Sequence, residues 1–559
     1  MLLSVRNLSY RHMHGSIRAV DDASFDIKAG ETVALVGKSG SGKSTLGYIL
    51  SGVIPQLIKG SELSGDVSFE DNVSYEVGYV SQIPENQLFG YRVEDAIVFG
   101  LENMGLDETE IRRRLNRVLE LFGIERFLNS PVSSLSGGQK QTVCIASVLA
   151  MEPQLLILDE PVSSLDPRGK ALVQEVLLQL KKEGQTVLLI DQNLDWSAEV
   201  VDRVMALEVG KVQFDGPKDD FFQDVDLYNR FGVTVPEMLE LYHMCDPKRG
   251  STLFSTVRGA VDYFQGIVNI SERKQTISQI NEEKTRTIEI QDLTKEFDGF
   301  RALNEVNAHF YRGAVTAVLG QNGSGKTTLV RHLIGLHEPT SGSILYEGQS
   351  IAGKSTADLA RSIAYVFQHP DQMIFEDSVW KEVTFSTRIM KREMDEARID
   401  DLLKEHALLE YKDAFPMNLS MGHKHMLTIL SVLLTDPEVI ILDEPTLGMD
   451  RMMKEMLFRL MDKLRNQGKT VIMISHEMSF VAETADEAIL MKDGNILLQG
   501  PTAEVFCHKN LLSEVSIEPP QVMQLADLLG YPDILTVPQF VDSCYPCYQH
   551  PLAEGEGQI

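Results

Sequence analysis

Two similar glycine-rich stretches decide the fold: residues 37–45 read GKSGSGKST and residues 320–328 read GQNGSGKTT. Both fit Gly-x-x-x-x-Gly-Lys-Ser/Thr, in which glycines let the backbone curl until several N–H groups point inward. A helix that begins at the lysine directs the positive end of its dipole to the same point. Each stretch is therefore expected to be a phosphate-binding loop between a strand and a helix.

All members of the two loops are expected to contact a nucleotide. They are Gly37, Lys38, Ser39, Gly40, Ser41, Gly42, Lys43, Ser44 and Thr45, and Gly320, Gln321, Asn322, Gly323, Ser324, Gly325, Lys326, Thr327 and Thr328. In this motif the lysine reaches the β- and γ-phosphates and the Ser or Thr after it binds magnesium. ATP and Mg²⁺ are thus the expected cofactors.

The loops belong to an internal repeat that includes nearly the whole chain. Asp159 in LLILDEP and Asp443 in VIILDEP differ by 443 − 159 = 284. Pro236 and Pro520, each in a segment beyond these motifs, differ by 520 − 236 = 284. A near-constant offset across several motifs indicates a duplicated unit.

Each repeat alternates strands and helices, which predicts an α/β fold with a parallel sheet around each phosphate loop. We expect tandem phosphate-loop domains, each with a helical subdomain and a C-terminal helical extension. The first is expected to include residues 1–245 and the second residues 286–559. The polar stretch within 246–285 is expected to be the linker.

Acidic pairs follow an apolar strand in each repeat. Asp159 and Asp443 are expected to hold the magnesium shell, directly or through water. Glu160 and Glu444 can then orient and polarise the attacking water as general bases. The alternative, acids that cap a helix after a buried strand, is disfavoured by the neighbouring phosphate loops.

Composition limits the classes of partner. The formal net charge of −29 over 559 residues argues against nucleic acid as the main partner, because phosphate backbones are bound by clustered Lys and Arg. No apolar run approaches the ~18 residues that span a bilayer, and the N-terminus turns polar too early for a signal peptide. A cytoplasmic protein that docks on an integral membrane partner is expected. Cys544 and Cys547 have the spacing of a redox or metal pair, but a structural or incidental role fits as well.

Together these motifs resemble ATP-binding-cassette ATPases. The resemblance rests on the tandem phosphate loops, LSGGQ at 135–139, the Asp-Glu-Pro strand ends, and Ser164-Leu165-Asp166. A narrower resemblance links residues 77–100 and 363–385 to the glutamine-loop region of energy-coupling-factor transporter ATPases. Those ATPases serve the uptake of vitamins or of cobalt and nickel ions, together with a transmembrane coupling subunit and a substrate-capturing membrane subunit.

The resemblance also assigns roles outside the phosphate loops. It implies that Gln82 and Gln368 sense the magnesium nucleotide. It implies that Glu85 and Asp371 meet an arginine of the transmembrane partner, although solvated loop acids would look the same. The residues implied to stack on adenine are Phe297 and His12, of which His12 could equally be a surface histidine.

In this family two cassettes close head to tail, so that each nucleotide lies between one phosphate loop and the signature of the other half. The first half has the regular signature and the second a rewritten one; the signature residues expected to contact ATP are Ser136, Gly137, Gly138 and Gln139, and Ser420 and Gly422. Met421 adds bulk where glycine would allow close approach. The switch histidine, His476, has Gln192 as its counterpart, since 476 − 284 = 192.

If the two halves close head to tail, the rewritten signature and Gln192 fall in the same nucleotide site. Site one joins Lys43, Glu160 and Gln192 with the Ser420 signature, and site two joins Lys326, Glu444 and His476 with the Ser136 signature. Gln192 donates a neutral hydrogen bond where histidine can donate a charge-assisted one. We therefore expect rapid hydrolysis at site two and slow turnover at site one.

Two alternatives remain open. One is a tandem-cassette ATPase that acts on ribosomes or nucleic acid, for which a long charged linker and basic surfaces would be expected. The other is the ATPase of a different type of importer. The transported substrate is not encoded in this chain.

Overall fold

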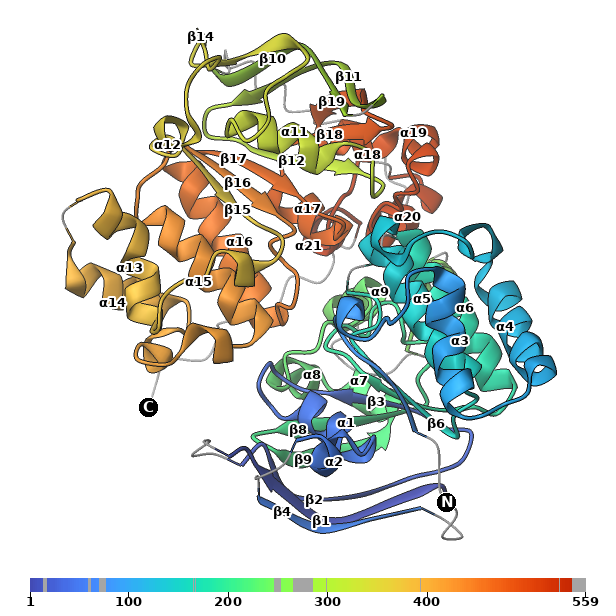
Figure 1. Cartoon of the computed structure of the whole chain (residues 1–559). Coiled ribbons are helices and arrows are strands. Elements are labelled where there is room, and N and C mark those ends of the chain that lie inside the picture. Colours follow the sequence, from blue (N-terminus) through green and yellow to red (C-terminus); the bar gives the residue numbers. More distant parts are fainter. Residues whose placement is uncertain are drawn as a thin grey trace.

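The computed structural model describes residues 1–13, 18–58, 62–69, 77–163, 165, 167–245, 253–264, 285–297, 299–392, 394–531 and 533–544. The side chains of Glu85 and Cys544 lie outside this description, as do Ser164, Asp166 and Cys547. Figure 1 shows two lobes, one formed by each repeat.

The first repeat is built on a six-stranded sheet with the order β5-β6-β7-β3-β8-β9, parallel except for the β8–β9 pair. Its strands are β3 (Thr32–Val36), β5 (Val77–Val80), β6 (Leu155–Asp159), β7 (Thr186–Ile190), β8 (Arg203–Glu208) and β9 (Lys211–Pro217). A separate antiparallel sheet has the order β2-β1-β4, from β1 (Leu3–Arg11), β2 (Val20–Ile27) and β4 (Glu62–Phe69).

Helices cover this sheet and extend beyond it. They are α1 (Lys43–Leu50), α2 (Val53–Gln56), α3 (Val93–Asn103), α4 (Glu108–Phe122), α5 (Gly137–Ala150), α6 (Pro167–Lys182), α7 (Lys218–Gln223), α8 (Val225–Arg230), α9 (Glu237–Cys245) and α10 (Val257–Phe264). Short 3₁₀ turns include η2 (Pro84–Asn86), η3 (Glu125–Phe127) and η4 (Val132–Ser134).

The second repeat has the same plan. Its six-stranded sheet has the order β15-β16-β17-β12-β18-β19, from β12 (Val315–Gly320), β15 (Ile363–Val366), β16 (Val439–Asp443), β17 (Thr470–Ile474), β18 (Glu487–Lys492) and β19 (Asn495–Pro501). Its antiparallel sheet has the order β11-β10-β13-β14, from β10 (Arg286–Phe297), β11 (Phe300–Tyr311), β13 (Ser341–Tyr346) and β14 (Gln349–Ser350).

The helices of the second repeat correspond closely to those of the first. They are α11 (Lys326–Leu333), α12 (Thr356–Leu359), α13 (Val379–Ile389), α14 (Glu396–Glu405), α15 (Met421–Leu433), α16 (Arg451–Asn466), α17 (Met478–Thr484), α18 (Thr502–Cys507), α19 (Lys509–Glu514), α20 (Gln521–Leu528) and α21 (Val537–Cys544). The 3₁₀ turns are η5 (Pro370–Gln372), η6 (Leu409–Tyr411) and η7 (Pro416–Asn418).

The apolar strands are central because both faces of each sheet are covered. Every residue of β3, β6, β7, β12, β16 and β17 is buried. Their continuous Val, Ile and Leu runs are typical of parallel strands between two layers. Parallel strands end at the same edge, so Asp159 at the end of β6 lies opposite Ile190 of β7, and Asp443 of β16 opposite Ile474 of β17. This edge positions the functional side chains.

The C-terminal extensions of the two repeats pack on one another. Helices α9 and α10 share an apolar cluster with α20 and α21, in which the rings of Phe264 and Phe540 lie 5.2 Å apart. Helix α10 falls within residues 246–285, the stretch expected to be a linker, and it belongs to this cluster. Figure 1 shows the two lobes meeting around α9 and α20.

Polar contacts flank the apolar cluster. The Arg451 guanidinium of α16 is ion-paired with Glu240 of α9. The backbone N–H of Val522 donates to Glu237 Oε2 at 3.0 Å. These contacts join the halves independently of any nucleotide. In the described part of the chain, no helix has the length and apolar character needed to cross a bilayer.

Candidate nucleotide sites

Backbone geometry explains why each phosphate loop begins with glycine. Gly37 and Gly320 have φ values of 146° and 150°. A Cβ at Gly37 would lie 2.2 Å from the Leu207 carbonyl oxygen, and one at Gly320 would lie 2.3 Å from the Met491 carbonyl oxygen. The loop is therefore pressed against the neighbouring strand end, β8 or β18, and only glycine fits there.

The loop lysines fold back on their own loops. Lys326 Nζ donates to the carbonyl oxygens of Gly320 at 2.6 Å and Gln321 at 2.8 Å. Lys43 Nζ donates to those of Gly37 at 2.7 Å and Lys38 at 3.0 Å. Burial lowers the pKa of Lys43. Both ammonium groups are therefore held at the mouth of their loop.

Each loop also contains a buried hydroxyl without a hydrogen-bond partner among the described residues, on Ser41 and on Ser324. Buried polar groups normally have a partner. Phosphate oxygens would supply acceptors for these hydroxyls and for the two lysines. The residues present thus fit the phosphates of ATP.

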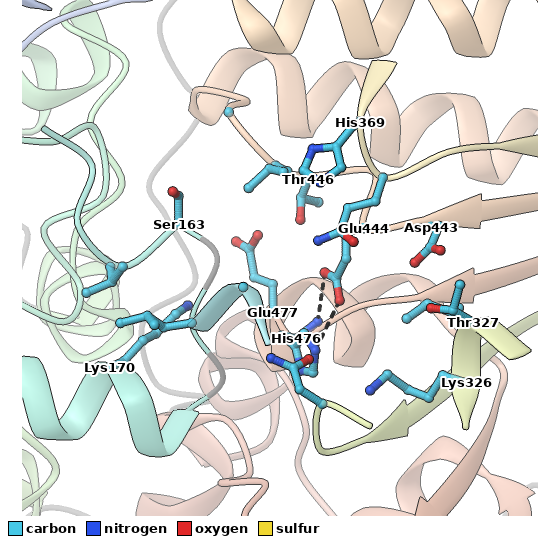
Figure 2. Close-up of a pocket in the computed structure, with 18 of the residues that line it drawn as sticks. Ser163, Lys170, Lys326, Thr327, His369, Asp443, Glu444, Thr446, His476 and Glu477 are labelled. Carbon is cyan, nitrogen blue, oxygen red and sulfur yellow. Dashed lines mark hydrogen bonds and ion pairs between the residues drawn. The ribbon is translucent and has the colours of Figure 1, made fainter. Parts of the chain in front are cut away.

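A cavity of about 610 Å³ lies between the two halves, and Figure 2 shows it. The second half contributes Lys326 and Thr327 from the phosphate loop region, and Gln368, Asp443, Glu444 and His476. The first half contributes Gly137 of the regular signature, Ser163, Leu165 and Lys170. Glu160, Asp191 and Gln192 of the first half line the same cavity, and Gly137 is the one residue of the regular signature among its lining residues. The cavity therefore combines most of the residues expected for site two with buried polar groups of the first half.

Glu444 lies at the centre of this cavity. Its Oε2 accepts the backbone N–H of His476 at 3.2 Å, and its Oε1 lies 3.3 Å from His476 Nε2. Burial, followed by the charge of Asp443, raises the pKa of Glu444 to about 8. Burial lowers the pKa of His476 to about 3, so this imidazole is neutral at ordinary pH. A carboxylate with a raised pKa beside a neutral imidazole suits a group that accepts a proton from water.

The oxygen groups expected to hold magnesium lie along the same cavity: Thr327, Gln368 and Asp443. Hard oxygen donors of this kind suit Mg²⁺, which also retains waters and phosphate oxygens. Asp443 Oδ2 accepts a hydrogen bond from the hydroxyl of Tyr365 at 2.8 Å, which orients the carboxylate. Burial raises the pKa of Asp443. Among the described residues no three His, Cys, Asp or Glu side chains converge as a metal site, which accords with a set of one carboxylate, one hydroxyl and one amide.

The aromatic residue expected to stack on adenine in the second half, Phe297, lines the cavity. The cavity is also lined by Phe300, which is 67% exposed and which the sequence analysis did not single out. In the first half, His12 packs edge-on against Tyr10, with ring centroids 4.9 Å apart. Tyr10 is buried and so cannot stack on a nucleotide.

Glu160, the carboxylate expected to be the general base of the first half, makes different contacts. Glu160 accepts a short hydrogen bond from Gln82 Nε2. Gln192, the counterpart of His476, donates from Nε2 to Ser39 Oγ of the phosphate loop at 3.0 Å. Burial raises the pKa of Glu160 to about 8, and the charge of Asp191 adds to this rise.

Asp191 is a third buried acid at this site. Its Oδ2 accepts from Trp196 Nε1 at 3.0 Å and its Oδ1 from the Asn193 backbone N–H at 2.9 Å. Its counterpart in the second half is Ser475, since 191 + 284 = 475. Asp159 accepts hydrogen bonds from Tyr79 and from Ser44, the residue expected to share the metal with it. The first half therefore holds an extra buried carboxyl group next to its base.

The two signatures cap their helices differently. In the regular one, Ser136 Oγ accepts the Gln139 backbone N–H at 3.3 Å, and Gln139 Oε1 accepts the Ser136 N–H at 2.9 Å. In the rewritten one, Ser420 Oγ again accepts the backbone N–H of His423, at 3.3 Å. There, however, the hydroxyl itself is 2.7 Å from His423 Nδ1.

The first atoms of the Met421 side chain pack closely against Gly448. A Cβ built on Gly448 would lie 2.7 Å from both Cβ and Cγ of Met421. The methionine side chain therefore rests on Gly448 of its own half. Gly422 is equally confined, because an added Cβ would lie 2.6 Å from the Gly448 carbonyl oxygen.

The acids expected to dock a partner can be placed only in part. The Asp371 carboxylate is ion-paired with Lys424 of α15 at 2.9 Å, and the side chain of Glu85 lies outside the described residues. Aromatic pairs flank both glutamine loops, with Phe89, Phe99 and Phe375 exposed and Phe385 half-buried. Phe89 and Phe99 lie 5.6 Å apart, and Phe375 and Phe385 lie 5.8 Å apart.

Several contacts were missed from the sequence, although signals for some were present. Tyr79 and Tyr365 each precede a glutamine by three residues, so their repetition could have been noticed. Lys454 of α16 donates to Glu477 at 2.6 Å, whereas its counterpart Lys170 has Asn193 at the position equivalent to Glu477. Figure 2 shows Lys170 on the opposite side of the cavity from His476.

Two phosphate-loop domains that share a cavity define a tandem-domain ATPase. The family model described as "ABC transporter" matches the chain twice, at residues 20–163 and 303–447. The chain belongs to this family of ATP-binding ABC transporter ATPases.

Similar proteins extend over the full length. An inferred ABC transporter ATP-binding protein of Methanosarcina mazei is 36% identical over 96% of this chain and 96% of its own length. Another, of Caldanaerobacter subterraneus subsp. tengcongensis, is 33% identical over 94% of this chain and 96% of its own length. Among solved structures, a complex of the archaeal ribosomal stalk protein aP1 and the archaeal ribosome recycling factor aABCE1 has a TM-score of 0.58 and 21% identity. It covers 91% of this chain and 92% of that chain, and this likeness shows the tandem fold alone.

Proposed function

We propose that this chain is the ATP-hydrolysing subunit of a membrane uptake transporter of the energy-coupling-factor type, for a vitamin or a transition-metal ion. It is peripheral on the cytoplasmic face of the membrane. It acts there with a transmembrane coupling subunit and a substrate-capturing membrane subunit, and without nucleic acid.

The observation that carries the proposal is the duplicated aromatic pair beside the glutamine loops. Phe89 is 58% exposed and Phe375 is 71% exposed. They occupy equivalent positions, since 375 − 89 = 286 and the glutamines also differ by 368 − 82 = 286. Exposed aromatic groups at matching places on both halves mark a surface for an apolar partner. Their position next to Gln82 and Gln368 would link that partner to the nucleotide sites.

Hydrolysis at site two would use groups that already lie together. Lys326 and the loop N–H groups hold the phosphates, and the positive end of α11 assists them. Thr327, Gln368 and Asp443 would hold Mg²⁺, which would neutralise charge on the β- and γ-phosphates. Glu444 accepts a proton from the attacking water, while His476 and the signature of the first half position the γ-phosphate.

Site one would bind ATP with slow turnover. Its base, Glu160, lacks a histidine neighbour, and Gln192 is held by Ser39. Closure of the halves on ATP and reopening after hydrolysis would move the two aromatic pairs relative to one another, and so drive the membrane subunit.

Co-purification from membranes tests the proposal. Phe89→Ser and Phe375→Ser, separately and together, are expected to lose integral membrane proteins that accompany the unmodified chain. Leu528→Ser is the matched control, because Leu528 is 66% exposed on α20, far in sequence from either glutamine loop. Ribosomes or nucleic acid in place of membrane proteins would refute the proposal, as would equal losses from all three substitutions.

A further inference from the structure

The rewritten signature changes the hydrogen bonding of its serine. In the first half, Ser136 Oγ acts as an acceptor for the Gln139 N–H, and its hydroxyl proton has no acceptor among the described residues. That proton is free to be donated to a phosphate across the interface. In the second half, the equivalent hydroxyl of Ser420 lies 2.7 Å from the ring nitrogen Nδ1 of His423.

The ring of His423 is held in this position. It packs against the ring of Tyr411, with centroids 5.3 Å apart and planes tilted by 58°. Burial lowers the pKa of His423, against the opposing charges of Asp450 and Glu410, so the imidazole is neutral at ordinary pH. With its proton on Nε2, the ordinary form of neutral histidine, Nδ1 is an acceptor. The Ser420 hydroxyl then donates to the ring.

We propose that His423 is a positioning residue that holds the hydroxyl of Ser420 and so withholds the signature donor from the γ-phosphate of site one. The proposal rests on the proposed function, in which Ser420 faces the nucleotide of the first half. It adds that His423 is the residue responsible for the slow turnover of site one.

Contacts between the two halves support the placement of Ser420 opposite the nucleotide of the first half. The backbone N–H of Arg451, at the start of α16, donates to the Gly232 carbonyl oxygen at 3.4 Å. A Cβ on Gly232 would lie 3.3 Å from Lys38 Cγ and 3.5 Å from Asp450 Cβ. The segment that follows β16 in the second half therefore lies beside the phosphate loop of the first half, and Asp450 in that segment also exerts its charge on His423.

Met421 is a weaker explanation for slow turnover. Its side chain rests on Gly448 within its own half, so its bulk is accommodated there. His423 is the substitution that alters a donor. A single donor to developing phosphate charge is worth about 10²–10³ in rate when it is removed from an otherwise complete site.

The test isolates site one in the full-length chain. In a Glu444→Gln background, which removes the base of site two, phosphate release is measured at saturating ATP and Mg²⁺. Adding His423→Gln restores the residue found in the regular signature. It is expected to raise the residual rate about tenfold, less than a full donor because Gln192 is unchanged.

Two further variants identify the source of the gain. Adding Ser420→Ala must remove it, since the gain acts through that hydroxyl. Adding Glu160→Gln must also return the rate to the background level, because Glu160 is the base of site one. A gain that persists through either change would overturn the inference, as would an unchanged or lower rate in the His423→Gln variant. Melting temperatures equal to that of the Glu444→Gln chain exclude a folding effect.

The reciprocal exchange gives an independent measurement. Gln139→His in an otherwise unmodified chain places a histidine beside Ser136 and is expected to slow site two by at least tenfold. No change there would contradict the proposal. A different outcome concerns the proposed function alone: if Glu444→Gln leaves most of the ATPase rate, site two is not the principal site.

Discussion

The two nucleotide sites have the same backbone and different hydrogen bonds. In the second half His476, the expected switch residue, contacts Glu444, the expected base, through both its backbone N–H and its ring. In the first half the equivalent Gln192 turns to the phosphate loop, and Gln82 contacts the base instead. A duplicated fold can therefore keep every strand and still give two sites of different chemistry, because the function depends on side-chain contacts at the sheet edge.

The strongest way to break this comparison is to remove each base in turn. Glu444→Gln is expected to lower steady-state ATPase of the assembled transporter by about 10²–10⁴, the range that a general base contributes. Glu160→Gln is expected to lower it less than about threefold, since site one turns over slowly and contributes little to the rate. Phosphate release measures both. Equal losses would show that the sites are equivalent.

The switch position gives the next largest effect. His476→Gln is expected to reduce ATPase about 10²-fold, because the amide does not reproduce the contact of the imidazole ring with Glu444 or its position toward the γ-phosphate. Gln192→Ala is expected to change it less than about twofold, because Gln192 contacts Ser39 rather than the base. ATP binding, followed with a fluorescent analogue, should remain in both variants. A larger loss from Gln192→Ala would reverse the assignment of the fast site.

Two equivalent lysines, Lys170 of α6 and Lys454 of α16, are expected to contribute unequally to the free energy of unfolding. Lys454 is paired with Glu477, which is only 24% exposed, so Lys454→Met leaves that carboxylate without its cation. A loss of about 1–3 kcal/mol in the free energy of unfolding is expected. Lys170→Met is the comparison variant and is expected to cost less than Lys454→Met, because Asn193 stands where Glu477 does and Lys170 acts on the buried Asp191 and Asp195 through its charge. Denaturant titration measures both, and similar losses would mean that Lys170 has a partner of equal strength.

A pH dependence gives a further way to sharpen the comparison. Burial raises the pKa of Glu237 to about 8, so its folded form favours the protonated acid. Its contribution to stability is complete below its ordinary pKa and declines as the pH rises toward 8, by at most about 1.4 kcal/mol per unit. Glu237→Gln copies the second half, where the equivalent residue is Gln521, since 237 + 284 = 521. In the Glu237→Gln variant, the melting temperatures at pH 5 and pH 8 should differ less than they do in the unmodified chain. An unchanged difference would contradict the raised pKa of Glu237.

The sequence was sufficient for the parts of this molecule that depend on local pattern. The phosphate loops, the buried strands and the paired acids at strand ends all follow from residue type and spacing. The repeat was visible because motif offsets are preserved. These features are local, so tertiary packing does not alter them.

Contacts between distant side chains could not be predicted. Gln192 has an amide that could bond Glu160 or Ser39, and only the packing of the loop selects Ser39. Residues 246–285 were expected to be a linker, and α10 within them joins the apolar cluster because Ala260 and Phe264 share one face. The contact of Met421 with Gly448, 27 residues later by 448 − 421 = 27, could likewise not be predicted.

The close contact of Met421 with Gly448 restricts the order in which substitutions at positions 421 and 448 can occur. A Cβ at position 448 would lie 2.7 Å from the methionine side chain, so any other residue there excludes methionine at 421. Glycine at 448 with glycine at 421 is free of this clash. A chain that changes one residue at a time therefore has one open route, in which the glycine at 448 comes first. While methionine stands at 421, position 448 is confined to glycine, so the substitution that made the two signatures unequal also fixes a second residue.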